Sequence, residues 1–278
     1  MGHGKLKKFA ENETFRCLLQ PSAQEVLADG FFNMRDHAIK GHWNETMFDA
    51  PRPIVLELGC GKGEYTIDLA QRNPDCNYIG VDIKGARLWK GAKYATQHGL
   101  GNVAFLRTRI EFITAYFAPG EVSEIWLTFS DPQFRSENSR LTSPLFLERY
   151  RSFLKPGGIV HLKTDSMFLH QYSRAVAERN GLRVLGCTED LYGTPCEALP
   201  TGLTAETVGA LYEVQTFYEK MFLEQGYKIT YLSFVIDHDG PYEHPTDFDE
   251  DYWRSVEGPR LLFGHDSAET RRQKLHSD

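Results

Sequence analysis

The chain alternates between short apolar runs and longer segments in which apolar residues recur every three or four positions. Short apolar runs are typical of buried strands, and the longer period is typical of amphipathic helices. Strands are expected at Ile54–Leu58, Asn77–Asp82, Val103–Leu106, Glu124–Phe129, Ile159–Thr164, Leu182–Cys187 and Tyr227–Ile236. Helices are expected at Glu64–Arg72, Gly85–His98, Ile110–Phe117, Pro144–Leu154, Ser166–Asn180 and Thr216–Gln225. This alternation predicts an α/β fold with a doubly wound, mostly parallel seven-stranded sheet.

The same pattern divides the chain into three parts. Residues 1–50 have weak periodicity and are interpreted as an N-terminal arm and linker. Residues 51–236 form the main domain, with an insertion at about 189–210 that is rich in Thr, Gly and Pro. Residues 237–278 are interpreted as an acidic C-terminal tail of loop or disorder.

Charge and composition bear on the partners and the cellular location that this protein can have. The net charge is −7, but residues 237–278 hold eleven acids against five Lys or Arg, and the rest of the chain is nearly neutral. A nucleic-acid partner is therefore not excluded, since only the local field at the binding face matters. No run of about 18 apolar residues and no charged-then-apolar leader is present, which favours a cytoplasmic protein without a membrane partner. The five scattered cysteines favour neither a disulfide framework nor a metal site.

The first strand ends in three glycines, Gly59, Gly61 and Gly63, and a helix pattern follows at once. Glycines allow a sharp turn and leave no side chain between the backbone and a ligand. The free amides of a helix start also favour polar or anionic groups. The sequence therefore predicts a nucleotide-like cofactor at this turn.

The carboxylates of Glu57 and Asp82 bear on which nucleotide-like cofactor binds at this turn. The dinucleotide fingerprint places its third glycine three positions after the second; here Glu64 stands at that position. Glu57 suits an ammonium group better than a pyrophosphate, and Asp82 ends the second strand where it can hold ribose hydroxyls. S-adenosylmethionine carries an ammonium, a sulfonium and no phosphate. It is favoured over a nicotinamide cofactor and over the alternative that Glu57 is only a salt-bridged strand residue.

Two further carboxylates follow later strands. Asp131 lies just after the fourth predicted strand and Asp165 directly after the fifth. Because ligands of open parallel sheets lie beyond the carboxyl ends of the strands, these acids are expected to form one constellation with Glu57 and Asp82. The alternative for Asp165 is a helix cap.

These motifs resemble the tRNA (guanine-N7-)-methyltransferase family from about Lys5 to Phe234. The resemblance rests on Leu56–Glu64, Ile79–Asp82, Phe129–Pro132, Leu154–Gly158, Lys163–Asp165 and the Thr-x-x-Glu element of Gln215–Lys220. It implies a Rossmann-like class I methyltransferase that transfers a methyl group from S-adenosylmethionine to N7 of a guanine in tRNA, in this family the variable-loop guanine. A monomer and a homodimer are both left open, and so is a catalytically silent RNA-binding subunit with the same fold.

The resemblance also implies roles for single residues. Cofactor contacts are expected from Glu57, Gly59, Gly61, Gly63, Asp82, Arg109, Ile110, Glu111 and Asp131, and Asp131 is also the expected catalytic residue. Substrate contacts are expected from Arg135, Asp165, Thr216 and Glu219. The family usually has Pro-Asp-Pro-Trp before a basic loop; here Ser130 and Gln133 replace Pro and Trp, and Arg135 stands for a lysine. Arg135, Arg140 and the Lys5–Lys8 arm are expected to contact phosphates.

Overall fold

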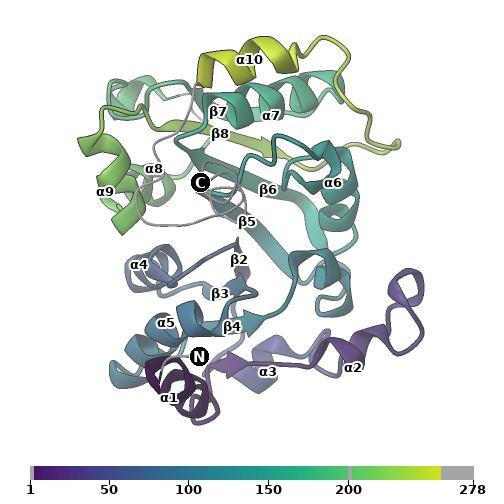
Figure 1. Cartoon of the computed structure of the whole chain (residues 1–278), viewed down its shortest axis with the longest axis vertical. Coiled ribbons are helices and arrows are strands. Elements are labelled where there is room, and N and C mark those ends of the chain that lie inside the picture. The colour runs from purple at the N-terminus through teal and green to yellow at the C-terminus, as the bar shows by residue number, and fades with distance from the viewer. Residues whose placement is uncertain (1–2, 200–201, 258–278) are drawn as a thin grey trace, which may run out of the picture.

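The computed structural model describes residues 3–199 and 202–257. Its centre is one sheet with the strand order β1-β4-β3-β2-β5-β6-β8-β7 (Figure 1). β8 runs antiparallel to both neighbours, and the other pairs are parallel. The strands are β1 (Leu18–Leu19), β2 (Ile54–Leu58), β3 (Asn77–Asp82), β4 (Val103–Arg107), β5 (Val122–Thr128), β6 (Leu154–Thr164), β7 (Val184–Thr188) and β8 (Thr230–Val235). The predicted α/β fold is confirmed, and the two-residue β1 is added to the seven predicted strands.

Five of the six expected helices are α-helices at the predicted places, and the one expected at Ile110–Phe117 is a 3-10 turn. The α-helices are α1 (His3–Asn12), α2 (Ala23–Leu27), α3 (Trp43–Met47), α4 (Glu64–Arg72), α5 (Gly85–Gln97), α6 (Pro144–Arg151), α7 (Met167–Arg179), α8 (Ala205–Glu213), α9 (Phe217–Glu224) and α10 (Glu250–Glu257). Short 3-10 turns are η1 (Phe31–Asn33), η2 (Ile110–Ala115), η3 (Glu137–Ser139) and η4 (Cys196–Ala198). α6 ends three residues before the predicted boundary, because Leu154 already pairs with Val122 in the sheet.

Each face of the sheet has its own apolar core. Ile54, Leu56 and Leu58 of β2 belong to the core that includes residues of α3, α6 and α7. Val55 points to the opposite core, which includes residues of α4, α5 and α8. Both faces of the central strands are therefore covered, as the apolar runs predict for parallel strands. Glu57 interrupts the run on the face that α4 covers.

Five α-helices lie in segments where the sequence predicts none, namely α1, α2, α3, α8 and α10, and two of them, α1 and α10, pack against predicted helices. α1 lies beside α5, and α10 lies along α7 at the top of Figure 1. α1 is tied to α5 by an ion pair of 2.9 Å between Lys93 Nζ and Glu11 Oε1, and by a hydrogen bond from Trp89 to the same carboxylate. α10 lies within the predicted acidic tail, whose residues 258–278 lie outside the described part. Tertiary contacts hold both helices, and local periodicity does not record such contacts.

The approach of α5 to the glycine loop leads to a stability prediction. A Cβ on Gly91 of α5 would lie 2.6 Å from the Phe105 ring and 2.8 Å from the Lys62 carbonyl oxygen. Gly91→Ala should therefore lower the free energy of unfolding by about 1–3 kcal/mol, although alanine favours helices. Gly209 of α8 is the matched control, since its Cβ would meet nothing within 4 Å. Gly209→Ala should raise stability by about 0.5–1 kcal/mol. Urea unfolding of both variants checks this; equal effects of the two substitutions would contradict the close approach.

Candidate active site

The parallel register brings the predicted carboxylates to one edge of the sheet. Glu57 pairs with Gly80 of β3 on one side and with Trp126 of β5 on the other. Thr128, at the end of β5, pairs with Lys163 near the end of β6. Parallel strands in register end at the same edge. The chain therefore places Glu57, Asp82, Asp131 and Asp165 at the edge that the sequence predicts for a ligand.

The three glycines of the loop after β2 have different surroundings. Gly59 and Gly61 have φ values of +84° and +58°, and a Cβ on either would meet nothing within 4 Å. Gly63 also has a positive φ, but its Cβ would lie 2.5 Å from the Phe105 ring. Gly59 and Gly61 therefore line open space where a ligand can approach the backbone, whereas Gly63 permits close packing beneath the loop.

Glu57 is a buried carboxylate held by neutral donors. Its Oε2 accepts hydrogen bonds from the Thr66 amide at 2.8 Å and from the Thr66 hydroxyl, and its Oε1 accepts one from Thr128 Oγ1 at 2.5 Å. Burial raises the pKa of Glu57 to about 7 despite these bonds. No cation pairs with Glu57 among the described residues, so the structure does not support the alternative of a salt-bridged strand residue.

Asp82 connects the end of β3 to the glycine loop. Its Oδ2 accepts a hydrogen bond of 3.0 Å from the Gly61 amide, and its Oδ1 accepts one of 2.6 Å from the Lys84 amide. Each carboxylate oxygen has a second lone pair, so these bonds leave acceptor capacity for ligand hydroxyls.

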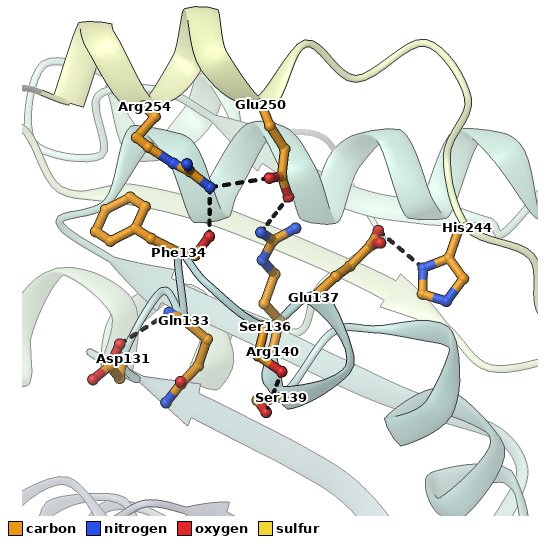
Figure 2. A network of polar contacts seen from close by, with 10 residues as sticks. All are labelled: Asp131, Gln133, Phe134, Ser136, Glu137, Ser139, Arg140, His244, Glu250 and Arg254. Atoms are coloured by element: carbon orange, nitrogen blue, oxygen red, sulfur yellow. Dashed lines mark hydrogen bonds and ion pairs between the residues drawn. The ribbon is translucent and has the colours of Figure 1, made fainter.

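Asp131 is exposed in a turn with an uncommon backbone. Phe129 and Gln133, on either side of it, have φ values of +52° and +50°, and they are the two non-glycine residues with positive φ in the described part of the chain. Asp131 Oδ1 accepts a hydrogen bond of 2.9 Å from the Gln133 amide, which closes the turn (Figure 2). Arg135 is exposed on the same loop. Such conformations are costly and persist where the surroundings enforce them.

Asp165 is buried at the end of β6, next to the residue that caps the following helix. The N-cap of α7 is Ser166, whose hydroxyl accepts a hydrogen bond of 3.0 Å from the Leu169 amide. The structure therefore assigns the capping role to Ser166, and the alternative of Asp165 as the N-cap is wrong.

Thr216 and Glu219 form a capping box at the start of α9. The Thr216 hydroxyl accepts a hydrogen bond of 3.2 Å from the Glu219 amide, and the Glu219 carboxylate accepts one of 3.4 Å from the Thr216 amide. The Glu219 side chain is fully buried and forms an ion pair of 2.7 Å with Lys163. Tyr192 donates a further hydrogen bond of 2.6 Å to it. The surrounding chain therefore already supplies its hydrogen-bond partners.

Comparisons with known proteins identify the family. Residues 51–201 match a family model described as "Putative methyltransferase". A tRNA (guanine-N(7)-)-methyltransferase of Christiangramia forsetii is 50% identical over 84% of this chain and 97% of its own length. The enzyme of that name from Bacteroides thetaiotaomicron is 46% identical over 88% and 90% of the two chains. The chain belongs to the tRNA (guanine-N(7)-)-methyltransferase family.

The family predicted from the motifs is thereby confirmed. A more distant member, from Levilactobacillus brevis, is 33% identical over 74% of this chain and 92% of its own. Among solved structures, the 16S rRNA methyltransferase KamB superposes with a TM-score of 0.49 at 15% identity. That match covers 73% of this chain and 94% of the other.

The expected adenine-binding segment of this methyltransferase lies at the start of η2. Arg109 precedes η2 in extended conformation, and its guanidinium forms an ion pair of 2.9 Å with Glu111. Ile110 begins the 3-10 turn and is partly buried. Since Glu111 has a partner of its own, the backbone of Arg109 and Ile110 stays the simpler means of holding adenine, as a prediction.

The residues that are expected to contact phosphates differ in their exposure and in their partners. Arg135 is exposed, but Arg140 is fully buried and pairs with Glu250 of α10. The expectation of a phosphate contact from Arg140 is therefore not supported by this structure. In α1, Lys8 Nζ lies 4.5 Å from the centroid of the Trp89 ring of α5.

Sequence reasoning missed three residues of this site. Lys163 is a cation inside an apolar strand, and that interruption was the available signal. Phe217 is 58% exposed at the start of α9, and Lys62 Nζ of the glycine loop lies 4.9 Å from the centroid of its ring. The Phe217 amide donates a hydrogen bond of 3.0 Å to Glu64. The pattern of apolar and polar residues along the sequence does not predict that α9 packs next to the glycine loop.

The described part of the chain has neither a membrane-spanning helix nor a cluster of metal ligands. No helix there is both long and apolar enough to cross a membrane. No group of three or more His, Cys, Asp or Glu is arranged there as a metal site.

The buried ion pair predicts how Glu219 variants will behave. Burial lowers the pKa of Lys163, and three acceptors stabilise its charge: Glu219 and the carbonyl oxygens of Leu211 and Val214, at 2.8 and 3.0 Å. Glu219→Gln should destabilise the protein by about 3–5 kcal/mol, because it leaves a buried charge without its partner. The double variant Lys163→Met/Glu219→Leu should recover most of that loss.

Thermal melting of both variants checks this prediction, and a Glu219→Gln protein as stable as wild type would contradict it. The double variant also tests the expected substrate contact of Glu219 apart from folding. If it is stable and fully active on tRNA, Glu219 has a structural role alone.

Proposed function

We propose that this protein transfers the methyl group of S-adenosylmethionine to N7 of a guanine in tRNA, and that its target is the variable-loop guanine. The observation that carries the proposal is Glu57, a buried carboxylate with neutral donors alone, beside glycines that line open space. A buried charge of this kind is costly without a cation. The ammonium of the methyl donor would supply that cation.

The residues present fit two polar parts of the donor, the ammonium and the ribose. Glu57 suits the ammonium, and Asp82 has free acceptor capacity for the two ribose hydroxyls. The open side of Gly59 and Gly61 allows close approach of the backbone. When bound, S-adenosylmethionine supplies an electrophilic methyl group on a sulfonium.

Methyl transfer to N7 requires correct positioning of the guanine, and it does not require a general base. Guanine N7 has an exposed lone pair at neutral pH, so no proton has to be removed before transfer. Holding the base in line with the methyl group can contribute roughly 7–11 kcal/mol. Guanine becomes cationic as the methyl arrives, and a fixed carboxylate such as Asp131 stabilises the developing charge.

Recognition of the base follows from donors and acceptors. Guanine presents N1–H and an exocyclic amine, and Asp165 can accept both hydrogen bonds. Adenine lacks this pair of donors on the corresponding edge. The exposed Arg135 can contact the RNA backbone, and the exposed Phe217 ring offers a face on which a base can stack. A cytoplasmic location and a monomeric or homodimeric state stay predictions.

A single assay tests the function and separates it from a silent RNA-binding subunit. The purified protein is incubated with unmodified tRNA and labelled methyl donor, and the product nucleoside is identified. We expect N7-methylguanosine. Tight tRNA binding without transfer of label would favour the silent subunit instead.

Asp165 and Ser166 form a matched pair for base recognition. Asp165→Asn keeps the Ser166 cap, so we expect normal binding of S-adenosylmethionine but a lower rate of tRNA methylation, because a poorly held base spends less time in line. Ser166→Ala removes the cap and should cost about 1 kcal/mol of stability while the folded enzyme stays active. Calorimetry, melting and single-turnover methylation measure these effects. Wild-type turnover in Asp165→Asn would exclude the guanine contact.

The raised pKa of Glu57 predicts that cofactor binding depends on pH. An ammonium favours the ionised carboxylate, so binding should release a proton, and the affinity should rise with pH and level off above the pKa of about 7. Between pH 7 and pH 6 the ionised fraction falls about fivefold, and the affinity should fall by the same factor. Glu57→Gln should remove this dependence. Calorimetry in two buffers of different ionisation enthalpy measures the proton release. An affinity that is flat between pH 6 and pH 7 would show that Glu57 does not meet the ammonium.

A further inference from the structure

The C-terminal segment packs firmly on the domain next to the Asp131 loop. Tyr242 is buried, and the Phe248 ring packs against the rings of Phe168 and Tyr172 of α7 at centroid distances of 5.4 and 5.5 Å. α10 follows and lies along α7. Figure 2 shows that side chains of this segment extend to the loop at residues 133–140, which joins Asp131 to α6.

Arg140 is the buried end of that loop. Its guanidinium lies 4.3 Å from the centroid of the Tyr172 ring and 4.8 Å from that of Phe168, and its side chain is 1% exposed. Glu250 of α10 forms an ion pair with it (Figure 2). A guanidinium at this depth requires a counterion, and α10 supplies it.

Arg254 connects α10 to the exposed part of the same loop. It forms an ion pair of 3.1 Å with Glu250 and donates a hydrogen bond of 2.5 Å to the Phe134 carbonyl oxygen. Phe134 stands between Gln133, whose φ is +50°, and Arg135. Arg254 therefore fixes the peptide that joins the Asp131 turn to Arg135.

Two further contacts belong to the same arrangement. His244 pairs with Glu137 of the loop at 2.9 Å. Glu257, at the end of α10, accepts a hydrogen bond of 2.9 Å from the Phe168 amide, three residues after Asp165. The C-terminal segment thus contacts the loop that carries Arg135 and the first turn of α7, which follows Asp165.

We propose that Glu250 and Arg254 are positioning residues of the methyltransferase, which hold the loop at residues 133–140 so that Asp131 and Arg135 face the tRNA. The positive φ of Gln133 makes this loop conformation costly, and the bond from Arg254 to the neighbouring Phe134 carbonyl oxygen stabilises it. This role rests on the proposed function. It also gives the acidic C-terminal segment a role near the expected tRNA-binding face, although the negative charge of this segment repels RNA.

The test uses the full-length protein with Arg254→Met and Glu250→Gln. We expect kcat/KM for tRNA to fall about tenfold in each, as for the loss of one charge-assisted hydrogen bond, while the Kd for S-adenosylmethionine stays within about twofold. The two changes together should be no worse than the stronger single change, because both act through one loop. Arg254→Lys should restore part of the activity.

The control is Arg179→Met. Arg179 pairs with Glu243 of the same C-terminal segment, is similarly exposed, and does not reach the loop. We expect unchanged kinetics from it. Hydrogen exchange gives a readout that does not depend on activity: amides of residues 133–140 should exchange faster in Arg254→Met than in Arg179→Met.

Three results would overturn the proposal. Lower melting temperatures with wild-type kcat/KM would mean that α10 serves stability alone. Tighter tRNA binding by Glu250→Gln would mean that the acidic helix repels RNA. Unchanged hydrogen exchange in the loop would mean that Arg254 does not hold it. If the wild-type protein transfers no methyl group, the proposed function fails, and the exchange and tRNA-binding measurements still decide the role of Arg254.

Discussion

The ring of Phe105 determines where the glycine loop can lie. It projects from β4 into the space left by three glycines, one in the loop (Gly63), one in β3 (Gly80) and one in α5 (Gly91). A Cβ on any of them would come within 2.5–2.8 Å of this ring. Three elements can therefore converge on one aromatic side chain. The loop rests on it and turns the open sides of Gly59 and Gly61 outward. Packing around Phe105 in the interior therefore fixes the backbone of the glycine loop, where the ligand is expected to bind.

Two buried charges on the same face of the sheet differ in their partners. Lys163 has Glu219 and two carbonyl oxygens, and this arrangement holds α8 and α9 against β6. Glu57 has three neutral donors and no cation among the described residues. A fully partnered charge serves the fold, whereas a charge held only by neutral donors can accept a ligand. Burial alone would not separate the two roles.

The sequence was most informative where one strand or one loop carries the signal. The central strands are buried on both faces, so their apolar runs predicted β2 and β3 at their observed bounds. The position of Glu57 and Asp82 followed from the rule that ligands of open parallel sheets lie beyond the carboxyl ends of the strands. By contrast, β1 is too short to show a period. α10 could not be predicted, because an ion pair and a hydrogen bond to residues more than a hundred positions away hold it. Asp165 and Ser166 are neighbours with similar capping propensity, and only the helix geometry distinguishes them.

The pair of Arg140 and Glu250 constrains how descendants of this protein can change. The two residues are 110 positions apart, and they differ in exposure: the Arg140 side chain is 1% exposed and that of Glu250 is 38%. Losing Glu250 first leaves a cation enclosed between aromatic rings, whereas losing Arg140 first frees a carboxylate that water can reach. In the evolution of this family, Arg140 should therefore be substituted before Glu250. Related sequences with a neutral residue at 140 and an acid at 250 should outnumber those with the reverse combination.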